Sequence, residues 1–249
     1  VFLLLSAASP AFCQNPKPMV SGSGIVYNSE KGGYFGLTTN HGWLVGYSKG
    51  TLKTYYKTSL FQVSLGEIKH EKEQRQASNP GYSRSWRPFV YGKQNNLFAV
   101  RAGWGAKRYF TEKARQKGVV VGMTYLAGPT IGLLKPYYLA LKKTGDLPGS
   151  ERVVVEKYSG ENASTFLDET KIIGAASFFS GFGDPKLTVG GQASLALHLD
   201  WGAFDEYLKA LEVGIQADLF SKKVPILVGE NNQRLFVQFF ATLQFGKRK

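Results

Sequence analysis

One stretch of the sequence holds a serine, a histidine and an acid at spacings that could support hydrolysis. Ser194, His198 and Asp200 are separated by even numbers of residues, so a β-strand would place all three side chains on one face. Ser194 and His198 would then lie roughly 13 Å apart along the strand, too far for the histidine to activate the serine directly. Asp200 is closer to His198 and could pair with it. We therefore expect a satisfied polar network here, with a hydrolytic site as the alternative.

A charged run at residues 67–75 alternates acidic and basic groups around one histidine. His70 could bind a metal together with Glu71 or Glu73, but alternating signs more simply indicate a solvated loop with internal ion pairs. The chain has a single cysteine, Cys13, and it lacks a phosphate-binding loop, a dinucleotide fingerprint, an HExxH motif and a Cys–His zinc spacing. We therefore predict no metal, no cofactor and no enzymatic activity.

The formal net charge of +13 indicates anionic surroundings. Lys and Arg are spread along the chain, and many lie near the ends of predicted strands, where they suit anionic lipid head groups. The predicted partners are therefore outer-membrane lipid or lipopolysaccharide, and other envelope proteins, but not nucleic acid.

The N-terminal residues have the composition of an export signal. Residues 1–13 begin with an apolar run and end with small residues, and Ala11 and Cys13 have the spacing of a signal-peptidase site. We predict a signal peptide at 1–13, truncated at its start, a proline-containing linker at 14–32, and one β-barrel domain at 33–249. No later segment has the 18 consecutive apolar residues of a transmembrane helix.

Several long segments alternate apolar with polar or small side chains, as strands with two unlike faces do. The polar face is predicted to comprise Arg101, Gln192, His198, Asp200, Glu212, Gln216, Asp218 and Gln238. The apolar face is predicted to comprise Leu195, Leu197, Val213, Ile215, Val237, Phe239, Leu243 and Phe245. A soluble small barrel would carry charges outside, whereas these runs are long enough to cross a bilayer and end in aromatic residues. The pattern therefore favours an antiparallel transmembrane β-barrel with a polar lumen and a lipid-facing apolar surface.

Three segments give the chain a family resemblance: the terminal strand with its FGKRK ending, the GEIKHEKE stretch at 66–73, and residues 209–227. They resemble a family of Gram-negative outer-membrane β-barrel proteins that mostly have no assigned function. The resemblance implies an outer-membrane location and no particular chemistry.

The strands are predicted at 33–40, 43–50, 58–69, 96–107, 118–128, 131–141, 172–181, 187–201, 208–219 and 233–246. Ten is the preferred number within a range of 8 to 12, because bacterial barrels have even numbers of strands. Three strands separate the long connections at 70–95 and 142–171, which would place these on opposite sides of the membrane. Residues 161–176 are alternatively read as a short helix in a loop.

Taken together, these patterns predict a non-enzymatic outer-membrane β-barrel of a Gram-negative bacterium, structural or part of an envelope or secretion assembly. Three alternatives remain at this stage: a small passive, anion-preferring pore, an outer-membrane lipid hydrolase using Ser194 and His198, and a secreted soluble ligand-binding β-barrel.

Overall fold

The computed structural model describes residues 27–54, 56–77, 87–111, 118–144, 150–202, 206–229 and 232–249. The predicted signal peptide at 1–13 and most of the predicted linker at 14–32 lie outside the described residues. The first strand begins at Ser29, four residues before the predicted start of the barrel domain. Among the residues described, no helix is long and apolar enough to cross a membrane.

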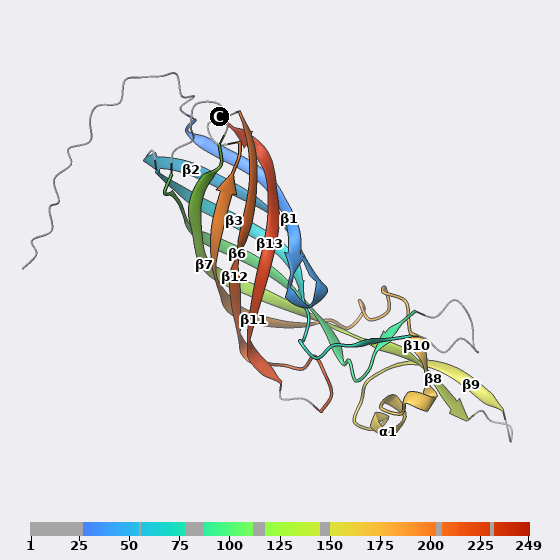
Figure 1. The fold of residues 1–249 in the computed structure, drawn as a ribbon. Coiled ribbons are helices and arrows are strands. Elements are labelled where there is room, and N and C mark those ends of the chain that lie inside the picture. Colours follow the sequence, from blue (N-terminus) through green and yellow to red (C-terminus); the bar gives the residue numbers. More distant parts are fainter. Residues whose placement is uncertain are drawn as a thin grey trace, which may run out of the picture.

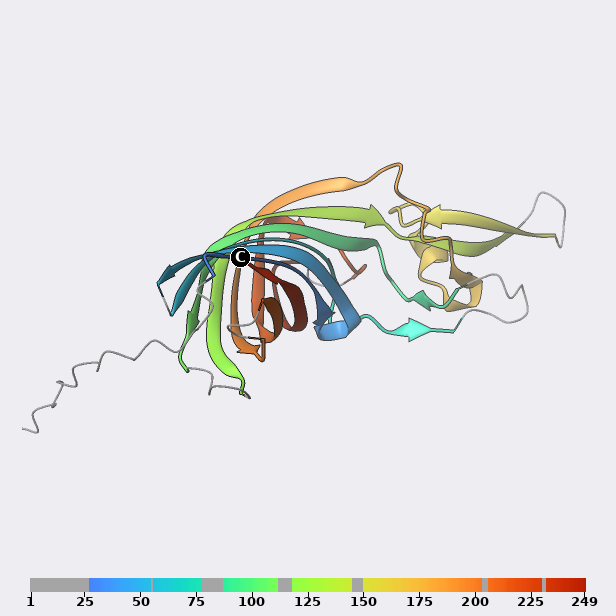
Figure 2. The same ribbon diagram turned by 90° about the horizontal axis from the view of Figure 1, so that it is seen from above.

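A closed antiparallel β-barrel forms the main body (Figures 1 and 2). Its eight strands follow the order β1-β13-β12-β11-β7-β6-β3-β2 around the ring, so the first and last strands pair and close it. The strands are β1 (Ser29–Thr38), β2 (Gly42–Thr54), β3 (Lys57–Ile68), β6 (Asn95–Tyr109), β7 (Val120–Pro136), β11 (Lys186–Asp200), β12 (Tyr207–Val224) and β13 (Gln233–Arg248). The predicted fold class is confirmed, and seven predicted strands coincide with barrel strands apart from shifts at their ends.

The preferred number of ten strands differs from the eight of the barrel for a reason that lies in β7. Residues 120–136 form one strand, where the sequence predicted two, at 118–128 and 131–141. Proline has no backbone N–H to donate, but the pairing of β6 with β7 omits Ala102 and Gly103, which lie opposite Pro129 and Gly128. Pro129 therefore sits at a break in the β6–β7 ladder, and the strand continues through it.

With β7 as one strand, the two long connections fall at the same end of the barrel. Two barrel strands, β6 and β7, separate residues 69–94 from residues 137–185. The 3₁₀ turn η1 (Thr39–His41) and residues 225–229 lie at this end as well. At the opposite end the start of β1 meets the C-terminus, because the backbone N–H of Lys249 donates to the carbonyl of Ser29 at 2.8 Å. The predicted placement of the long loops on opposite sides is thereby corrected.

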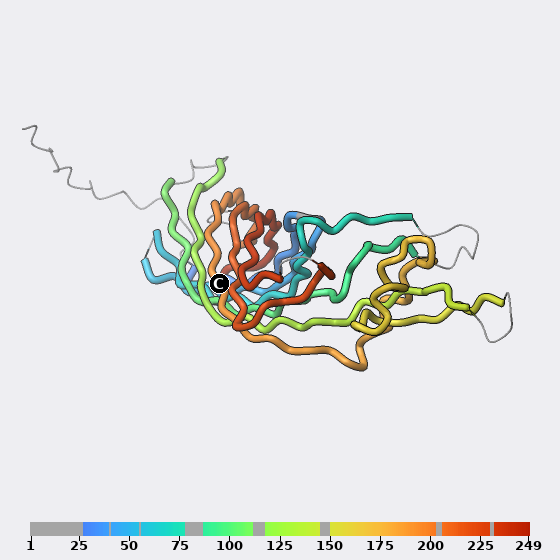
Figure 3. The backbone as a smooth tube through the Cα atoms, turned by 90° about the horizontal axis from the view of Figure 1, so that it is seen from below, coloured from blue at the N-terminus to red at the C-terminus, as the bar shows by residue number. Residues whose placement is uncertain are grey.

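An accessory β-sheet extends beyond the long-loop end, away from the C-terminus (Figures 1 and 3). Its order is β10-β8-β9, with β8 at Tyr138–Thr144, β9 at Glu151–Lys157 and β10 at Ile172–Ala175. The short helix α1 (Ala163–Phe166) and the 3₁₀ turn η2 (Glu169–Lys171) cover it, and Phe166 packs on Leu139 and Leu141. A two-stranded ribbon of β4 (Arg75–Gln76) and β5 (Phe89–Val90) lies nearby. The strand predicted at 172–181 is thus only β10 and lies outside the barrel, while residues 163–166 form the helix considered as the alternative.

An apolar cluster fills the barrel at its long-loop end. Its centre contains Leu97, Phe220 and Phe236, and the Phe220 and Phe236 rings meet edge to face with centroids 5.9 Å apart. Ile226 and Leu227 from the β12–β13 connection fold into the same cluster. We call this group of side chains the apolar plug, because it closes the barrel toward the accessory sheet.

Candidate functional site

Below the apolar plug, the barrel interior is filled by buried ion pairs. Arg101 forms a two-pronged pair with Asp218, with Nε to Oδ1 and Nη2 to Oδ2 both at 2.9 Å. The hydroxyl of Thr130 donates to the same carboxylate at 3.3 Å, and Gln216 reaches it at 3.4 Å. Both charged side chains are almost completely buried, so each depends on the other for compensation.

A second network occupies the end of the barrel where the start of β1 meets the C-terminus. Lys107 donates to Glu30 at 2.7 Å, and Arg248 forms an ion pair with Asp200. His198 lies 2.9 Å through Nδ1 from Glu212, and its Nε2 lies 3.7 Å from Asp200. His198 therefore lies between two carboxylates in a fully buried position. Its Nδ1 is hydrogen-bonded to Glu212, whereas its Nε2 has no hydrogen-bond partner among the described residues, so the polar network expected from the sequence is only partly satisfied.

The structure places all eight predicted polar-face residues in the interior. Arg101, His198, Asp200, Glu212, Gln216, Asp218 and Gln238 are buried, and Gln192 is half-buried beside a small internal cavity. The predicted apolar face points outward: Leu195, Leu197, Val213, Ile215, Val237, Phe239 and Phe245 are exposed, and Leu243 is half-buried.

The interior geometry is unfavourable for the hydrolytic alternative. Ser194 borders an internal cavity of about 30 Å³, which has room for about one water molecule. His198 has no exposed surface, and its Nδ1 is engaged by Glu212. Within the described residues, this cavity is too small to hold an ester substrate beside Ser194.

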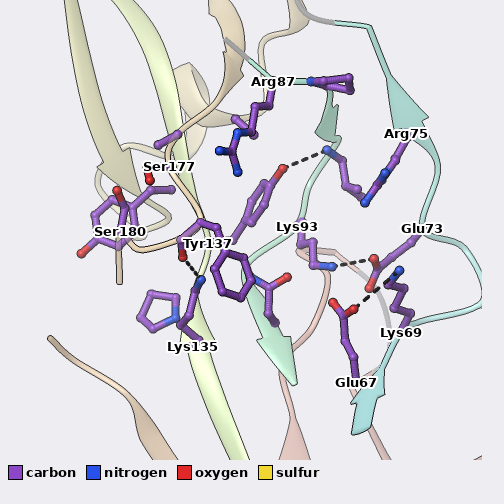
Figure 4. A pocket seen from close by; sticks show the side chains of 18 of the residues that line it. Glu67, Lys69, Glu73, Arg75, Arg87, Lys93, Lys135, Tyr137, Ser177 and Ser180 are labelled. Carbon is purple, nitrogen blue, oxygen red and sulfur yellow. Dashed lines mark hydrogen bonds and ion pairs between the residues drawn. The ribbon is translucent and has the colours of Figure 1, made fainter. Parts of the chain in front are cut away.

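A second hollow lies outside the barrel, between its long-loop rim and the accessory sheet (Figure 4). This cleft has a volume of about 590 Å³, within the range typical of ligand sites. Four separate parts of the chain line it: His41 of η1, the ends of β3 and β6 with the connection between them, the β7–β8 junction, and the end of β10 with the segment after it.

The charges that line the cleft are mostly positive. Its two acids are paired within the cleft, Glu73 with Lys93 at 2.6 Å and Glu67 with Lys69 at 3.6 Å. The Glu67–Lys69 pair is internal to residues 67–75, as expected, whereas Glu73 pairs outside that run with the buried Lys93. Arg75 and Arg87 also line the cleft and are exposed, and no ion pair found in the described part of the chain involves either. The cleft therefore carries two exposed guanidinium groups that form no ion pair with a carboxylate of the described residues.

An aromatic side chain stands between these arginines in the view of Figure 4. The Tyr137 hydroxyl accepts a hydrogen bond from the backbone N–H of Val90 at 3.3 Å, and the Lys93 ammonium lies 5.8 Å from the ring centroid. Burial raises the pKa of Tyr137, so the phenol stays neutral and adds no negative charge to the cleft.

Three adjacent strands change character at the level where the cleft begins. Outward residues of β3, β6 and β7 are apolar up to Leu65, Phe98 and Leu133, and the next outward residues are Glu67, Asn96 and Lys135. In the strand register, Glu67 lies opposite Phe98, and Asn96 lies opposite Lys135. The change from apolar to polar residues therefore occurs at nearly the same height on all three strands. The cleft therefore opens on the outer side of the barrel strands, directly beyond the apolar surface.

Sequence patterns did not reveal this cleft as a site. The charged run at 67–75 was visible, but Arg87, Lys135 and Tyr137 are far from it in the sequence. Only the return of the chain through β7 and the accessory sheet brings them together. A change from apolar to polar outward residues at the ends of two predicted strands, at Glu67 and Asn96, was the available signal.

Comparison with known proteins adds a likeness of fold. No protein-family model matches the chain, and no curated protein sequence does. Among solved structures, the chain is similar to Ail, the attachment invasion locus protein of Yersinia pestis, with 7% identity, a TM-score of 0.43, and coverage of 90% of this chain and 100% of that one. It is also similar to the N-terminal β-barrel domain of Pseudomonas aeruginosa OprF, with 12% identity, a TM-score of 0.36, and coverage of 90% and 98%. These structural neighbours are Gram-negative outer-membrane β-barrel proteins, and at such scores they assign no activity to this chain.

Proposed function

We propose that this protein is a non-enzymatic β-barrel of the Gram-negative outer membrane, in which a plugged barrel anchors an extramembrane accessory sheet and its cleft. One observation carries the proposal: the barrel is polar inside and apolar outside. Buried charges fill the interior, whereas large apolar side chains are exposed on every barrel strand. An apolar surface of this size would be unfavourable in water, whereas in a bilayer it contacts the acyl chains of the lipids.

Strand length and aromatic placement support the membrane reading. The barrel strands have 10 to 18 residues, and a tilted strand needs about 9–11 to cross a bilayer. Exposed aromatic residues occur near both ends, with Trp43 at the long-loop end and Trp201, Tyr207 and Phe245 at the other. Such girdles are typical of transmembrane barrels at the two membrane–water interfaces.

The packed interior supports an anchor over the passive pore. The internal cavity bordered by Arg101 and Glu212 holds about 30 Å³, and the apolar plug lies above it. A permanent aqueous path would require space that these side chains occupy. The buried charges are also paired with one another, as expected for a structural interior.

Membrane insertion is tested by charging the outer surface. Leu195 is 53% exposed and lies in the middle part of β11. Leu195→Arg should destabilise the protein by about 2–4 kcal/mol in lipid vesicles, whereas on a soluble barrel an exposed substitution changes stability by about 0.5 kcal/mol or less. The matched control is Lys186→Arg at the strand end, which keeps the charge.

Location is tested by cell fractionation and by gel mobility with and without heating. The protein should sediment with the outer membrane and migrate differently after boiling. The secreted soluble barrel would be favoured if the folded protein is recovered in the soluble fraction without detergent and if Leu195→Arg leaves its stability unchanged.

A further inference from the structure

An aromatic patch borders the cleft at the barrel rim. Phe178, Phe179 and Phe182 are 47%, 79% and 46% exposed, and their ring centroids lie 5.7 to 6.4 Å apart. Phe178 also meets Phe98 of β6 edge to face at 6.3 Å, and Phe98 packs beside Trp43 at 6.4 Å. The patch, defined here as Phe178, Phe179 and Phe182, thus joins the outward apolar surface of the barrel.

A buried lysine ties this patch to the cleft. Lys135 lines the cleft, and its ammonium donates to the carbonyl oxygen of Phe178 (Figure 4). The same ammonium lies 3.8 Å from the centroid of the Phe178 ring and 4.6 Å from that of Phe182. Cation–π contacts of this kind hold the rings against the cleft wall. Ser177 and Ser180 of the same segment also line the cleft, so one short segment presents both surfaces.

We propose that the cleft binds the anionic phosphate head group of a membrane lipid, whose acyl chains lie on the aromatic patch. This inference rests on the proposed function, since the patch can meet lipid only if the barrel spans a membrane. The ligand class follows from two adjoining surfaces, one cationic and one apolar, which together match an amphiphile.

The cationic surface suits a phosphate. Arg75 and Arg87 are exposed and free of the cleft's ion pairs, and a guanidinium binds phosphate oxygens through two parallel hydrogen bonds. Ser177 and Ser180 also line the cleft, and their side chains offer hydroxyl donors. A volume of about 590 Å³ accommodates a head group but not a folded protein segment.

The spacing along the strands suits a lipid rather than a free ion. On β6 the step from the apolar Phe98 to Asn96 at the cleft covers two residues, or about 7 Å. A lipid whose chains reach the level of Phe98 would therefore place its phosphate within the cleft. Phe179, with 79% of its surface exposed, is the most exposed ring and has no other apolar cover in the described residues.

The test measures lipid binding to the full chain in an uncharged detergent by titration calorimetry. The probes are dioctanoylphosphatidylglycerol, which is anionic, dioctanoylphosphatidylcholine, which is zwitterionic, and inorganic phosphate. The anionic lipid should bind at least about tenfold more tightly than either other probe. Arg75→Gln and Arg87→Gln should each weaken that binding by roughly tenfold.

Matched controls separate local effects from general loss of charge or apolar surface. Arg152→Gln removes an exposed cation from β9, outside the cleft, and should leave binding unchanged. Phe179→Ser should weaken binding of the anionic lipid without changing that of inorganic phosphate. Phe110→Ser, which removes an exposed phenylalanine at the opposite end of the barrel, should have no effect.

Three results would overturn the inference. Equal binding of inorganic phosphate and anionic lipid would make the cleft a site for free anions. Equal binding of both lipids would remove the role of charge, and wild-type affinity in both arginine variants would exclude the cleft. None of these results affects the Leu195→Arg and fractionation tests, so an outer-membrane protein with a negative lipid result would refute this inference alone.

Discussion

The buried pair of Arg101 and Asp218 allows the strongest quantitative test of the barrel interior. Asp218→Asn keeps the shape of the side chain and removes its charge, which leaves Arg101 buried without a counterion. The carboxylate accepts two charge-assisted hydrogen bonds at 2.9 Å, each with a net value of about 1.5–3 kcal/mol. The free energy of unfolding should therefore fall by about 3–5 kcal/mol, the usual cost of breaking a buried pair.

The double variant Arg101→Met/Asp218→Leu separates the pair's net contribution from the penalty of an unpaired charge. Replacing both partners with apolar side chains should cost far less than Asp218→Asn, because no buried charge remains. Urea unfolding of the protein in lipid vesicles, followed by tryptophan fluorescence, gives both values. Asp184→Asn is the matched control, because Asp184 pairs with Lys157 on the exposed surface, and it should leave the urea midpoint unchanged.

If Asp218→Asn has no larger effect than Asp184→Asn, the interior is hydrated and the charges there are screened. The reasoning that assigns the barrel a packed, water-poor interior would then be wrong. If the double variant Arg101→Met/Asp218→Leu is as unstable as Asp218→Asn, the cause is lost side-chain packing and not an unpaired charge, because the double variant leaves no buried charge at this position.

Three further predictions concern the plug, the patch and the accessory sheet. Planar bilayers containing the protein should show no steady conductance, because the apolar plug around Phe220 closes the barrel, and stable current steps would contradict this. Gly181→Ala should destabilise the patch segment by about 1 kcal/mol or more and reduce anionic-lipid binding, because Gly181 has φ +97° and an added Cβ would meet the carbonyl of Pro136 at 2.5 Å. The hydrogen bond from Lys143 lowers the pKa of Glu156 below its ordinary 4.5. The Lys143–Glu156 pair therefore contributes about 0.5 kcal/mol or less to the free energy of unfolding. This contribution is fully present above pH 4.5 and is lost as the pH falls through the lowered pKa. Amide exchange in the β8–β9 pair should accelerate over that window, and Glu156→Gln should remove the dependence.

Most of the barrel follows from the sequence, because lipid-facing and interior residues alternate with the period of the strand. The paired register of Leu195 with Ile215, and of Gln216 with Gln238, reproduces the two predicted faces across strands. Local chemistry was a poorer guide. Two strands were predicted at 118–128 and 131–141, whereas β7 continues through Pro129, because the missing donor of this proline falls at the break in the β6–β7 ladder.

The accessory sheet and the cleft could not be predicted for a different reason. β8, β9 and β10 are short and depend on the packing of Phe166 against Leu139 and Leu141 for their core. Such contacts are tertiary and leave little periodicity in the sequence. The cleft is less visible still, because Arg87 and Tyr137 become neighbours only through the path of the chain.

The junction between β7 and β8 has a mechanical consequence. Tyr137 alone separates Pro136, the last residue of β7, from Tyr138, the first of β8, and its backbone N–H donates to the carbonyl of Gln94 at 3.0 Å. The adjoining backbone is fastened again where Gln94 donates to the carbonyl of Ile226 at 2.8 Å. A connection of one hydrogen-bonded residue holds the accessory sheet rigidly to the barrel. Any tilt of the barrel axis is therefore carried directly into the orientation of the accessory sheet, so a change in bilayer thickness would re-aim the surface that this sheet presents.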